Sequence, residues 1–452
     1  MEGLFSWPWV EAQVAQTVCG WTACAALPLP SGPQYTPQEQ SRRENAYDEG
    51  LKAVEREAKK VPRSRAERLE AQRRIVAVFP RFASIALGLD DNAVQLLTDG
   101  FLPVGTELAR WASRFDPSLS MSSIIQACRN AWTSCGLQPL LGDRMAITPS
   151  ILGYSLLYPY SDNYMDHERI STEEKLTFSA RFSNRLRGLH LMPRDHHEAA
   201  VWAMVQLIEE QFPRPRYPQV FDCLLAIHRA QEASIAQLNG CYSENDDELL
   251  QITCAKGGTS VLADACLSHG WLNEEESLLA FEWGVLLQLG DDLQDVREDL
   301  RLGSVTLFSR AAKTRMPLDG LVVQLLNFSD HVADRMDRLP HGSPTHKDLL
   351  RMSWRSLIQM AVAKTPEFFA PSFLAELEPH SPFRFAFLRA RHERLSGRRG
   401  LYKILFDAFL EAGDANNGAL PEPEFWLQRA LAPQLNVYIS SSLNIGCGMS
   451  LR

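Results

Sequence analysis

The pattern of apolar and polar positions indicates α-helices over most of the chain. Apolar residues recur three and four positions apart, for example at Ile75, Val78, Phe79 and Phe82, which places them on one face of a helix. Alternating apolar and polar residues, the pattern of a half-buried strand, are scarce. The sequence therefore predicts an all-α protein. Helices are expected at about 91–115, 121–135, 149–167, 172–188, 195–212, 217–239, 246–269, 274–300, 303–313, 319–337, 346–364 and 383–395.

Capping residues mark several of the expected helix ends. Ser171 with Glu174 three residues later has the spacing of a capping box, which predicts that a helix begins just after Ser171. Asn273 with Glu276 has the same spacing and predicts the start of a long, acid-rich helix. Gly303 is placed to end that helix, because glycine readily adopts the left-handed conformation at a helix C-terminus.

Changes in composition divide the chain into three parts. Residues 25–40 (AALPLPSGPQYTPQEQ) are rich in proline and polar residues, so we expect residues 1–40 to form an irregular N-terminal arm. Residues 41–395 carry the helical pattern and are predicted to form one domain, an α-helical bundle with a central cavity. Residues 396–452 differ again in composition and are expected to be a C-terminal extension of unknown role.

The overall composition excludes several classes of protein. The 452 residues are 45% hydrophobic and carry a formal net charge of −9, which gives no overall basic footprint for nucleic acid. No stretch reaches the roughly 18–20 apolar residues needed to span a bilayer, and the N-terminus lacks the pattern of a signal peptide. The nine cysteines are odd in number and form no CxxC pair, which suits a reducing compartment. We therefore expect a cytoplasmic protein without a transmembrane segment.

An acidic cluster follows directly after a segment that is predicted to form a buried helix. The segment SLLAFEWGVLLQLG is largely apolar on every face and leads into DDLQDVREDL. At 100° per residue, Gln288, Asp291, Asp295 and Asp299 lie along one stripe with Asp292 beside it. Carboxylates carried inward in this way are costly to desolvate unless a cation joins them. The pattern therefore indicates a metal site.

A second acidic pair occurs earlier, in YSLLYPYSDNYMDHE. Asp162 and Asp166 are four residues apart and share a helix face, which extends back through Tyr158 to Tyr154. Both acidic clusters are expected at the C-terminal ends of their helices, where the helix dipole favours cations. Carboxylates from two helices that point into one bundle are a common way to build a multi-metal site. Ligands that are all oxygen favour Mg²⁺, which binds together with substrate phosphates.

A phosphorylated substrate would also require cationic side chains. Lys256 lies in CAKGGTS, where Gly257 and Gly258 allow close backbone approach. Arg181 and Arg185 in SARFSNRLRG follow the first acidic pair in the sequence. Taken singly, each of these motifs also fits a solvated helix, a core tyrosine or a surface lysine. Their order along the chain is what favours a common site.

The order AKGGTS, then QLGDDLQDVREDLRLGSVTLF, resembles the class I isoprenoid synthase superfamily of trans-prenyltransferases, squalene-synthase-like enzymes and class I terpene synthases. The resemblance covers about residues 60–395. It implies a helical bundle in which two aspartate-rich motifs bind three Mg²⁺ ions together with the diphosphate of an allylic prenyl substrate. The predicted metal ligands and catalytic residues are Asp162, Asp166, Asp291, Asp292 and Asp295. The predicted substrate-binding residues are Lys256, Thr259, Arg181, Arg185, Gln288 and Tyr158.

The first motif, DNYMD, is most similar to the DxxxD of bacterial class IB terpene synthases. The N-terminal helices also lack the glycine-lysine-arginine element that holds isopentenyl diphosphate in chain-elongating relatives. The resemblance therefore implies a Mg²⁺-dependent terpene synthase, a carbon-oxygen lyase that releases pyrophosphate, and it favours a homodimer. Two alternatives stay open. One is a prenyltransferase that elongates or joins prenyl diphosphates, and the other is a non-catalytic helical metal-binding or scaffold protein.

Overall fold

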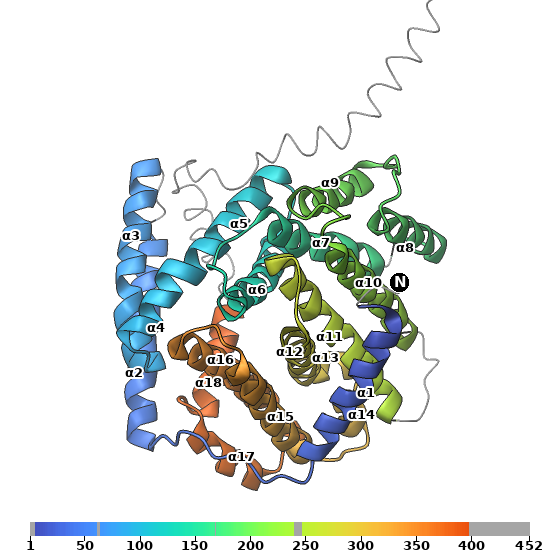
Figure 1. Ribbon diagram of the computed structural model, residues 1–452. Helices are drawn as coiled ribbons and strands as arrows, with labels where there is room; N and C mark the ends of the chain where they lie inside the picture. The colour runs from blue at the N-terminus through green and yellow to red at the C-terminus, as the bar shows by residue number, and fades with distance from the viewer. Residues whose placement is uncertain (1–4, 61–63, 168, 239–245, 397–452) are drawn as a thin grey trace, which may run out of the picture.

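The computed structural model of the chain describes residues 5–60, 64–167, 169–238 and 246–396, and within these it leaves out a few side chains, including those of Tyr158, Asp162 and Asp166. This part of the chain is helical and contains no strand, as Figure 1 shows. The all-α prediction is therefore confirmed.

The helices up to the middle of the chain are α1 (Trp7–Cys24), α2 (Pro37–Ala58), α3 (Arg65–Phe82), η1 (Ala83–Leu87), α4 (Asp91–Gln95), η2 (Leu96–Phe101), α5 (Leu102–Phe115), α6 (Met121–Leu137), η3 (Gln138–Leu141), α7 (Pro149–Asp166), α8 (Thr172–Leu186) and α9 (His196–Gln211). The remaining helices are α10 (Pro218–Leu238), α11 (Asp246–His269), α12 (Glu274–Gln294), α13 (Val296–Leu302), α14 (Leu307–Lys313), α15 (Asp319–Arg338), α16 (Pro344–Lys364), η4 (Pro366–Phe368), α17 (Pro371–Leu377), η5 (Glu378–His380) and α18 (Phe385–Ser396).

The expected helix ends agree closely with the observed ones. Both predicted capping boxes form: Glu174 N–H donates to Ser171 Oγ at 3.2 Å, and Glu276 N–H donates to Asn273 Oδ1 at 3.0 Å. Gly303 ends α13 with φ 78°. Two expected helices are divided. The segment predicted at 91–115 forms α4, η2 and α5, and the segment predicted at 274–300 breaks at Asp295 into α12 and α13.

The N-terminal arm differs from its prediction. Instead of an irregular segment, residues 7–24 form α1, which packs against α11 and α15. Its buried residues Val10, Val14, Thr17 and Trp21 recur three and four positions apart, so the helical stripe is present in the sequence. Proline and polar residues give an extended connection only after α1, up to the cap at Thr36.

The centre of the molecule is the pair α11 and α12, which other helices surround in Figure 1. Nearly every residue of α11 from Thr253 to Ser268 is buried, because α1, α6, α7, α10 and α12 all pack against it. A Cβ on Gly257 would lie 2.6 Å from the carbonyl oxygen of Gly284. The two glycines therefore let α11 and α12 approach backbone to backbone, and this contact sets Lys256 on α11 beside the acids of α12.

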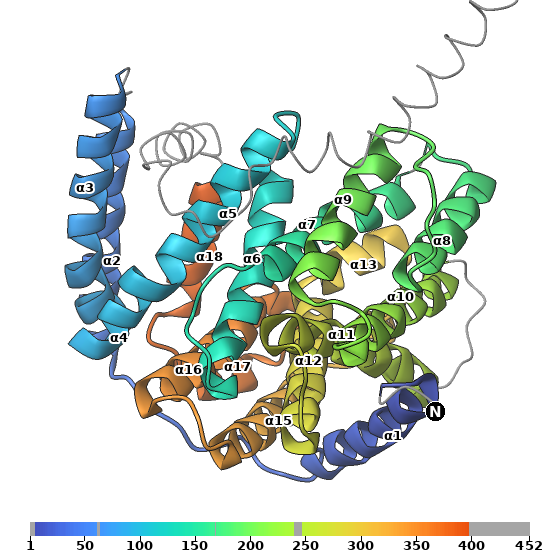
Figure 2. The same cartoon turned by 45° about the horizontal axis from the view of Figure 1, so that its top comes forward.

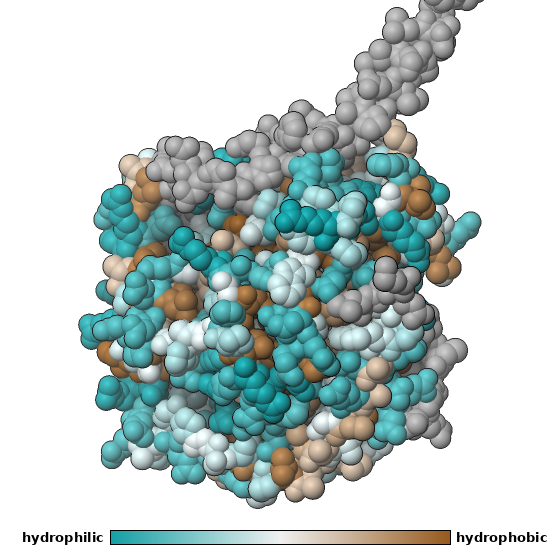
Figure 3. Space-filling model, viewed as in Figure 1, coloured by the Kyte–Doolittle hydropathy of each residue, from teal (hydrophilic) through white to brown (hydrophobic). Residues whose placement is uncertain are grey.

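The surface in Figure 3 is mainly hydrophilic, with hydrophobic residues scattered among polar ones. Within the described part of the chain, no helix is both long enough and apolar enough to cross a lipid bilayer.

Candidate active site

A cavity of about 270 Å³ lies where the C-terminal ends of α7 and α12 meet α8, α10 and α11. Figure 2 shows this part of the bundle, with α13 among α7, α8 and α10. The lining residues are Ser161, Met165, Phe178, Ser179, Phe182, His228, Gln231, Glu232, Ser234, Ile252, Thr253, Lys256, Gln288, Asp291, Asp292, Asp295, Asp299, Ser304, Val305 and Thr306. The cavity therefore has one wall of acids and another of aromatic residues with a histidine.

Helix α7 brings the first predicted motif to this cavity. Ser161 and Met165 line it, and each immediately precedes one of the two predicted ligands, Asp162 and Asp166. The side chains of these aspartates and of Tyr158 are outside the described part of the structure. The turns of α7 that carry Asp162 and Asp166 therefore border the cavity that Asp291, Asp292 and Asp295 line.

Asp292 is the most buried acid of the second motif, with 7% of its surface exposed. Gln288 Nε2 donates to its Oδ1 at 2.8 Å, and Thr253 Oγ1 donates to its Oδ2 at 3.3 Å. Burial raises the pKa of Asp292 to about 7, although the Gln288 hydrogen bond and the Lys256 charge oppose this shift. The local hydrogen bonds therefore leave part of the desolvation cost uncompensated.

Three further aspartates share the acidic wall. Burial raises the pKa of Asp291, with Arg129 opposing the shift and Asp295 adding to it. Burial also raises the pKa of Asp295, and it raises that of Asp299 to about 6 with a further contribution from Asp295. Because these carboxylates disfavour one another's ionisation, a bound cation would stabilise all of them at once.

The composition of the acidic wall fits a hard divalent cation. It presents carboxylate oxygens from four aspartates, which are the ligands that Mg²⁺ prefers. Among the described residues, no group of three or more His, Cys, Asp and Glu side chains is positioned to hold a metal ion. The predicted ligand set also includes Asp162 and Asp166, whose side chains are outside that comparison.

The predicted substrate-binding residues divide into two groups. Lys256 and Gln288 line the cavity. Thr259 does not: it is fully buried, and its hydroxyl donates to the Ala255 carbonyl one turn back in α11 at 2.6 Å.

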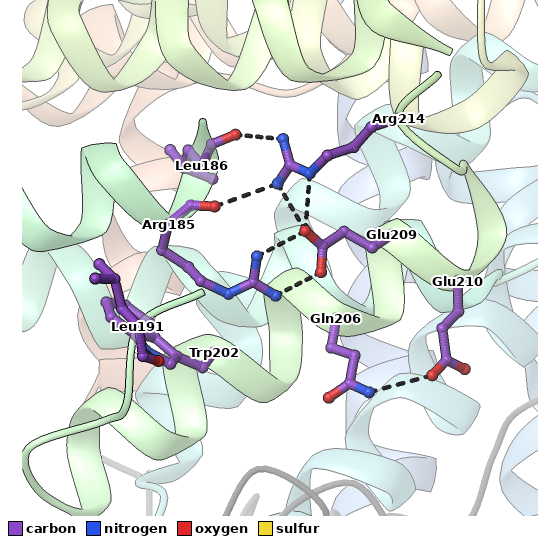
Figure 4. Close-up of polar contacts among 8 residues, drawn as sticks. All are labelled: Arg185, Leu186, Leu191, Trp202, Gln206, Glu209, Glu210 and Arg214. Carbon is purple, nitrogen blue, oxygen red and sulfur yellow. Dashed lines mark hydrogen bonds and ion pairs between the residues drawn. The ribbon is translucent and has the colours of Figure 1, made fainter. Parts of the chain in front are cut away.

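Arg181 and Arg185 also lie away from the cavity and link α8 to α9. Arg181 donates to both oxygens of the buried Glu198, at 2.7 and 2.8 Å. Arg185 donates to Glu209 Oε1 at 2.6 Å, and Arg214 donates to the same oxygen at 2.8 Å, as Figure 4 shows. These arginines are therefore occupied in ion pairs between helices and do not face the place expected for a phosphate.

The sequence did not single out several residues that line the cavity. They are Thr253, Ser179, His228 and Glu232, together with Phe178 and Phe182, and Asp299 was noted only as part of the acidic stripe. The aromatic rings of Phe178 and Phe182 stack with centroids 5.8 Å apart, and His228 meets Phe182 edge to face at 5.2 Å. An isolated histidine in an apolar helix gives no sequence signal of its role.

One more buried acid, Asp264 on α11, lies between α11 and α6. It is 1% exposed and accepts from Ser134 Oγ at 2.6 Å and from Asn130 Nδ2 at 3.0 Å. Burial raises its pKa to about 8, although both hydrogen bonds oppose the shift. Asp264 is therefore predominantly protonated at neutral pH.

Comparison with models of protein families, with curated proteins and with solved structures finds no match for this chain.

Proposed function

We propose that this protein is a Mg²⁺-dependent class I terpene synthase with an isoprenoid synthase-type fold. It would ionise an allylic prenyl diphosphate, convert the carbocation to a terpene and release pyrophosphate. The observation that supports this most directly is that α7, next to Asp162 and Asp166, and α12, with Asp291 and Asp292, border the same cavity. A helix that carries the first motif and the acids of the second, far apart in the sequence, thus border one pocket, and this supports the proposal.

The acidic wall would hold the metal ions through Asp291, Asp292 and Asp295, together with Asp162 and Asp166 from α7. When bound, Mg²⁺ supplies Lewis-acid stabilisation of the diphosphate leaving group. Lys256 lies on the same wall and would neutralise part of the phosphate charge. Gln288 and Thr253 hydrogen-bond to the two oxygens of Asp292 and fix its orientation.

The aromatic wall is suited to a cationic hydrocarbon. Phe178 and Phe182 present stacked rings that are 4% and 6% exposed. A ring face stabilises a nearby cation by about 0.5–2 kcal/mol, and apolar walls keep water from the carbocation. The prenyl chain would therefore extend from the acidic wall toward these rings.

Incubation with Mg²⁺ and geranyl, farnesyl or geranylgeranyl diphosphate tests the proposal. We expect pyrophosphate release and a hydrocarbon or alcohol product that can be identified by gas chromatography and mass spectrometry. Asp292→Asn and Asp162→Asn should each lower turnover by about 10²–10³-fold, because each removes stabilisation of the leaving group. Asp99→Asn, a change at an exposed aspartate, is the matched control. Unchanged turnover in the first two variants would rule out the proposed metal sites.

Product analysis and calorimetry separate the competing functions. A prenyltransferase would give a longer carbon chain when isopentenyl diphosphate is added, whereas a terpene synthase would not. A non-catalytic scaffold would bind Mg²⁺ in calorimetry without any change that depends on diphosphate.

A further inference from the structure

The aromatic wall of the cavity contains a polar cluster made of Ser179 on α8 with His228 and Glu232 on α10. Ser179 Oγ donates to Glu232 Oε1 and lies 3.3 Å from His228 Nε2, which is 3.5 Å from Glu232 Oε1. All three residues line the same cavity as the acidic motif. The cluster therefore places hydrogen-bonding and titratable groups beside the rings expected to face a carbocation.

His228 is the residue of this cluster best suited to accept a proton. Among the described residues lining the cavity, it is the only imidazole, and it is 8% exposed. Burial lowers its pKa, while the Glu232 carboxylate opposes the shift and Arg187 adds to it. The ring is therefore neutral near pH 7 and has a lone pair available.

The hydrogen bonds indicate which ring nitrogen carries that lone pair. Because Ser179 gives its hydroxyl proton to Glu232, its oxygen is left as an acceptor. The Nε2 edge of His228 faces this oxygen and the Glu232 carboxylate, so a proton on Nε2 satisfies the network best. This tautomer leaves Nδ1 as the basic atom, and Glu232 then balances the charge of the protonated ring.

We propose that His228 is the general base that ends the carbocation reaction, with Glu232 and Ser179 as positioning residues. This assignment rests on the proposed function. Heterolysis of the allylic C–O bond leaves its electron pair on the diphosphate and a cation on the hydrocarbon. His228 then removes a proton from the carbon next to the cationic centre, and the C–H electron pair becomes a new C=C bond. The resulting imidazolium, paired with Glu232, returns its proton to water when the product leaves.

The product chemistry tests this assignment. With Mg²⁺ and the geranyl, farnesyl and geranylgeranyl diphosphates, we measure the ratio of alkene to alcohol products together with pyrophosphate release. His228→Gln keeps a hydrogen-bonding group at the Nε2 position and removes the base. It should lower the alkene-to-alcohol ratio at least about tenfold, since a lost general base costs about 10²–10⁴-fold in the proton-transfer step, while pyrophosphate release falls much less.

Two further variants keep the test decisive. Glu232→Gln changes a side chain that is 47% exposed, so the fold should tolerate it, and it should shift the ratio in the same direction by a smaller factor. Ser183→Ala is the matched control, because its hydroxyl lies one turn from Ser179 and bonds Arg187 at 2.8 Å outside the cavity. It should leave the ratio unchanged.

The outcomes distinguish this assignment from the function on which it rests. Wild-type protein that releases no pyrophosphate from any of the three substrates overturns the proposed function and the assignment together. Turnover with the wild-type product ratio in both His228→Gln and Glu232→Gln overturns the assignment alone. If a folded His228→Gln variant loses pyrophosphate release and alkene product equally, His228 acts in the ionisation step, and its assignment as the general base is overturned.

Discussion

The acids on α9 and the acids at the end of α12 differ in what neutralises their charge. On α9, Glu198 and Glu209 each accept hydrogen bonds from arginines. Burial opposes ionisation of Glu209, yet the hydrogen bonds and charges of Arg185 and Arg214 together outweigh it, and the pKa of Glu209 is lowered. At the end of α12, burial raises the pKa values of Asp291 and Asp292 instead, despite some help from nearby cations.

The difference separates structural ion pairs from a site with unbalanced charge. Where a buried acid is paired with arginine, its charge is neutralised within the protein, and the ion pair links two helices. Where four acids share a wall with Lys256 and the half-exposed Arg129, negative charge is left over, which a ligand cation can neutralise. Acid-rich segments that look alike in sequence can therefore have opposite roles.

The largest expected effect concerns a buried acid that is neutralised by an arginine. Glu282 is 4% exposed and accepts hydrogen bonds from Arg335 at 2.7 and 3.0 Å. Arg335→Met removes the arginine and leaves this carboxylate buried with His331 Nε2 at 3.3 Å, so we expect a loss of about 3–5 kcal/mol in the free energy of unfolding. Urea denaturation measures it. The exposed pair Arg297–Glu367 is the control, and Arg297→Met should cost under about 1 kcal/mol. Equal losses in the two variants would contradict the distinction.

A smaller effect concerns the acids at the end of α12, whose negative charge is not fully neutralised by the protein. Mg²⁺ and pyrophosphate are treated as one ligand that binds in a single event. At about 100 times its apparent dissociation constant, this ligand should stabilise the folded protein by about 2.7 kcal/mol. Differential scanning fluorimetry measures the stabilisation. Asp292→Asn should remove most of it without destabilising the protein that lacks ligand, because the variant deletes a charge that burial already disfavours. A variant stabilised as strongly as the wild type would place the cation elsewhere.

The smallest effect concerns Asp264, which accepts its hydrogen bonds from the neutral side chains of Ser134 and Asn130. Its folded pKa is about 8, well above the value of about 3.9 in an unfolded chain. Between these two values the folded state binds more protons, so stability falls as pH rises from about 4 to 8 and stays lower above that.

Asp264→Asn keeps acceptors for Ser134 and Asn130 and removes the titration. Between pH 6 and pH 7 the wild type should lose about 1.4 kcal/mol of stability relative to this variant, because its folded state binds one more proton than its unfolded state over that interval. Urea midpoints at both pH values measure this, with Asp99→Asn as the exposed control. The same difference at both pH values would mean that packing, not ionisation, explains the change.

The sequence by itself determined the all-α class, most helix ends and the acids of the second motif. These features depend on local physics. Capping boxes such as Ser171 with Glu174 satisfy donors within one turn, and helical period alone puts Asp291 and Asp295 on a shared stripe. The α1 stripe of Val10, Val14 and Trp21 was also present, but proline-rich sequence after it obscured the prediction.

Only the tertiary structure decided which side chains share the cavity. Arg185 lies near the first motif in the sequence. In the folded protein it forms an ion pair with Glu209 of α9 and does not line the cavity. His228 carries no local signal, and it joins the site because α10 packs beside α8 and α11. Helical period fixes the face on which a side chain lies, but the helix that it meets depends on packing between residues far apart in the chain.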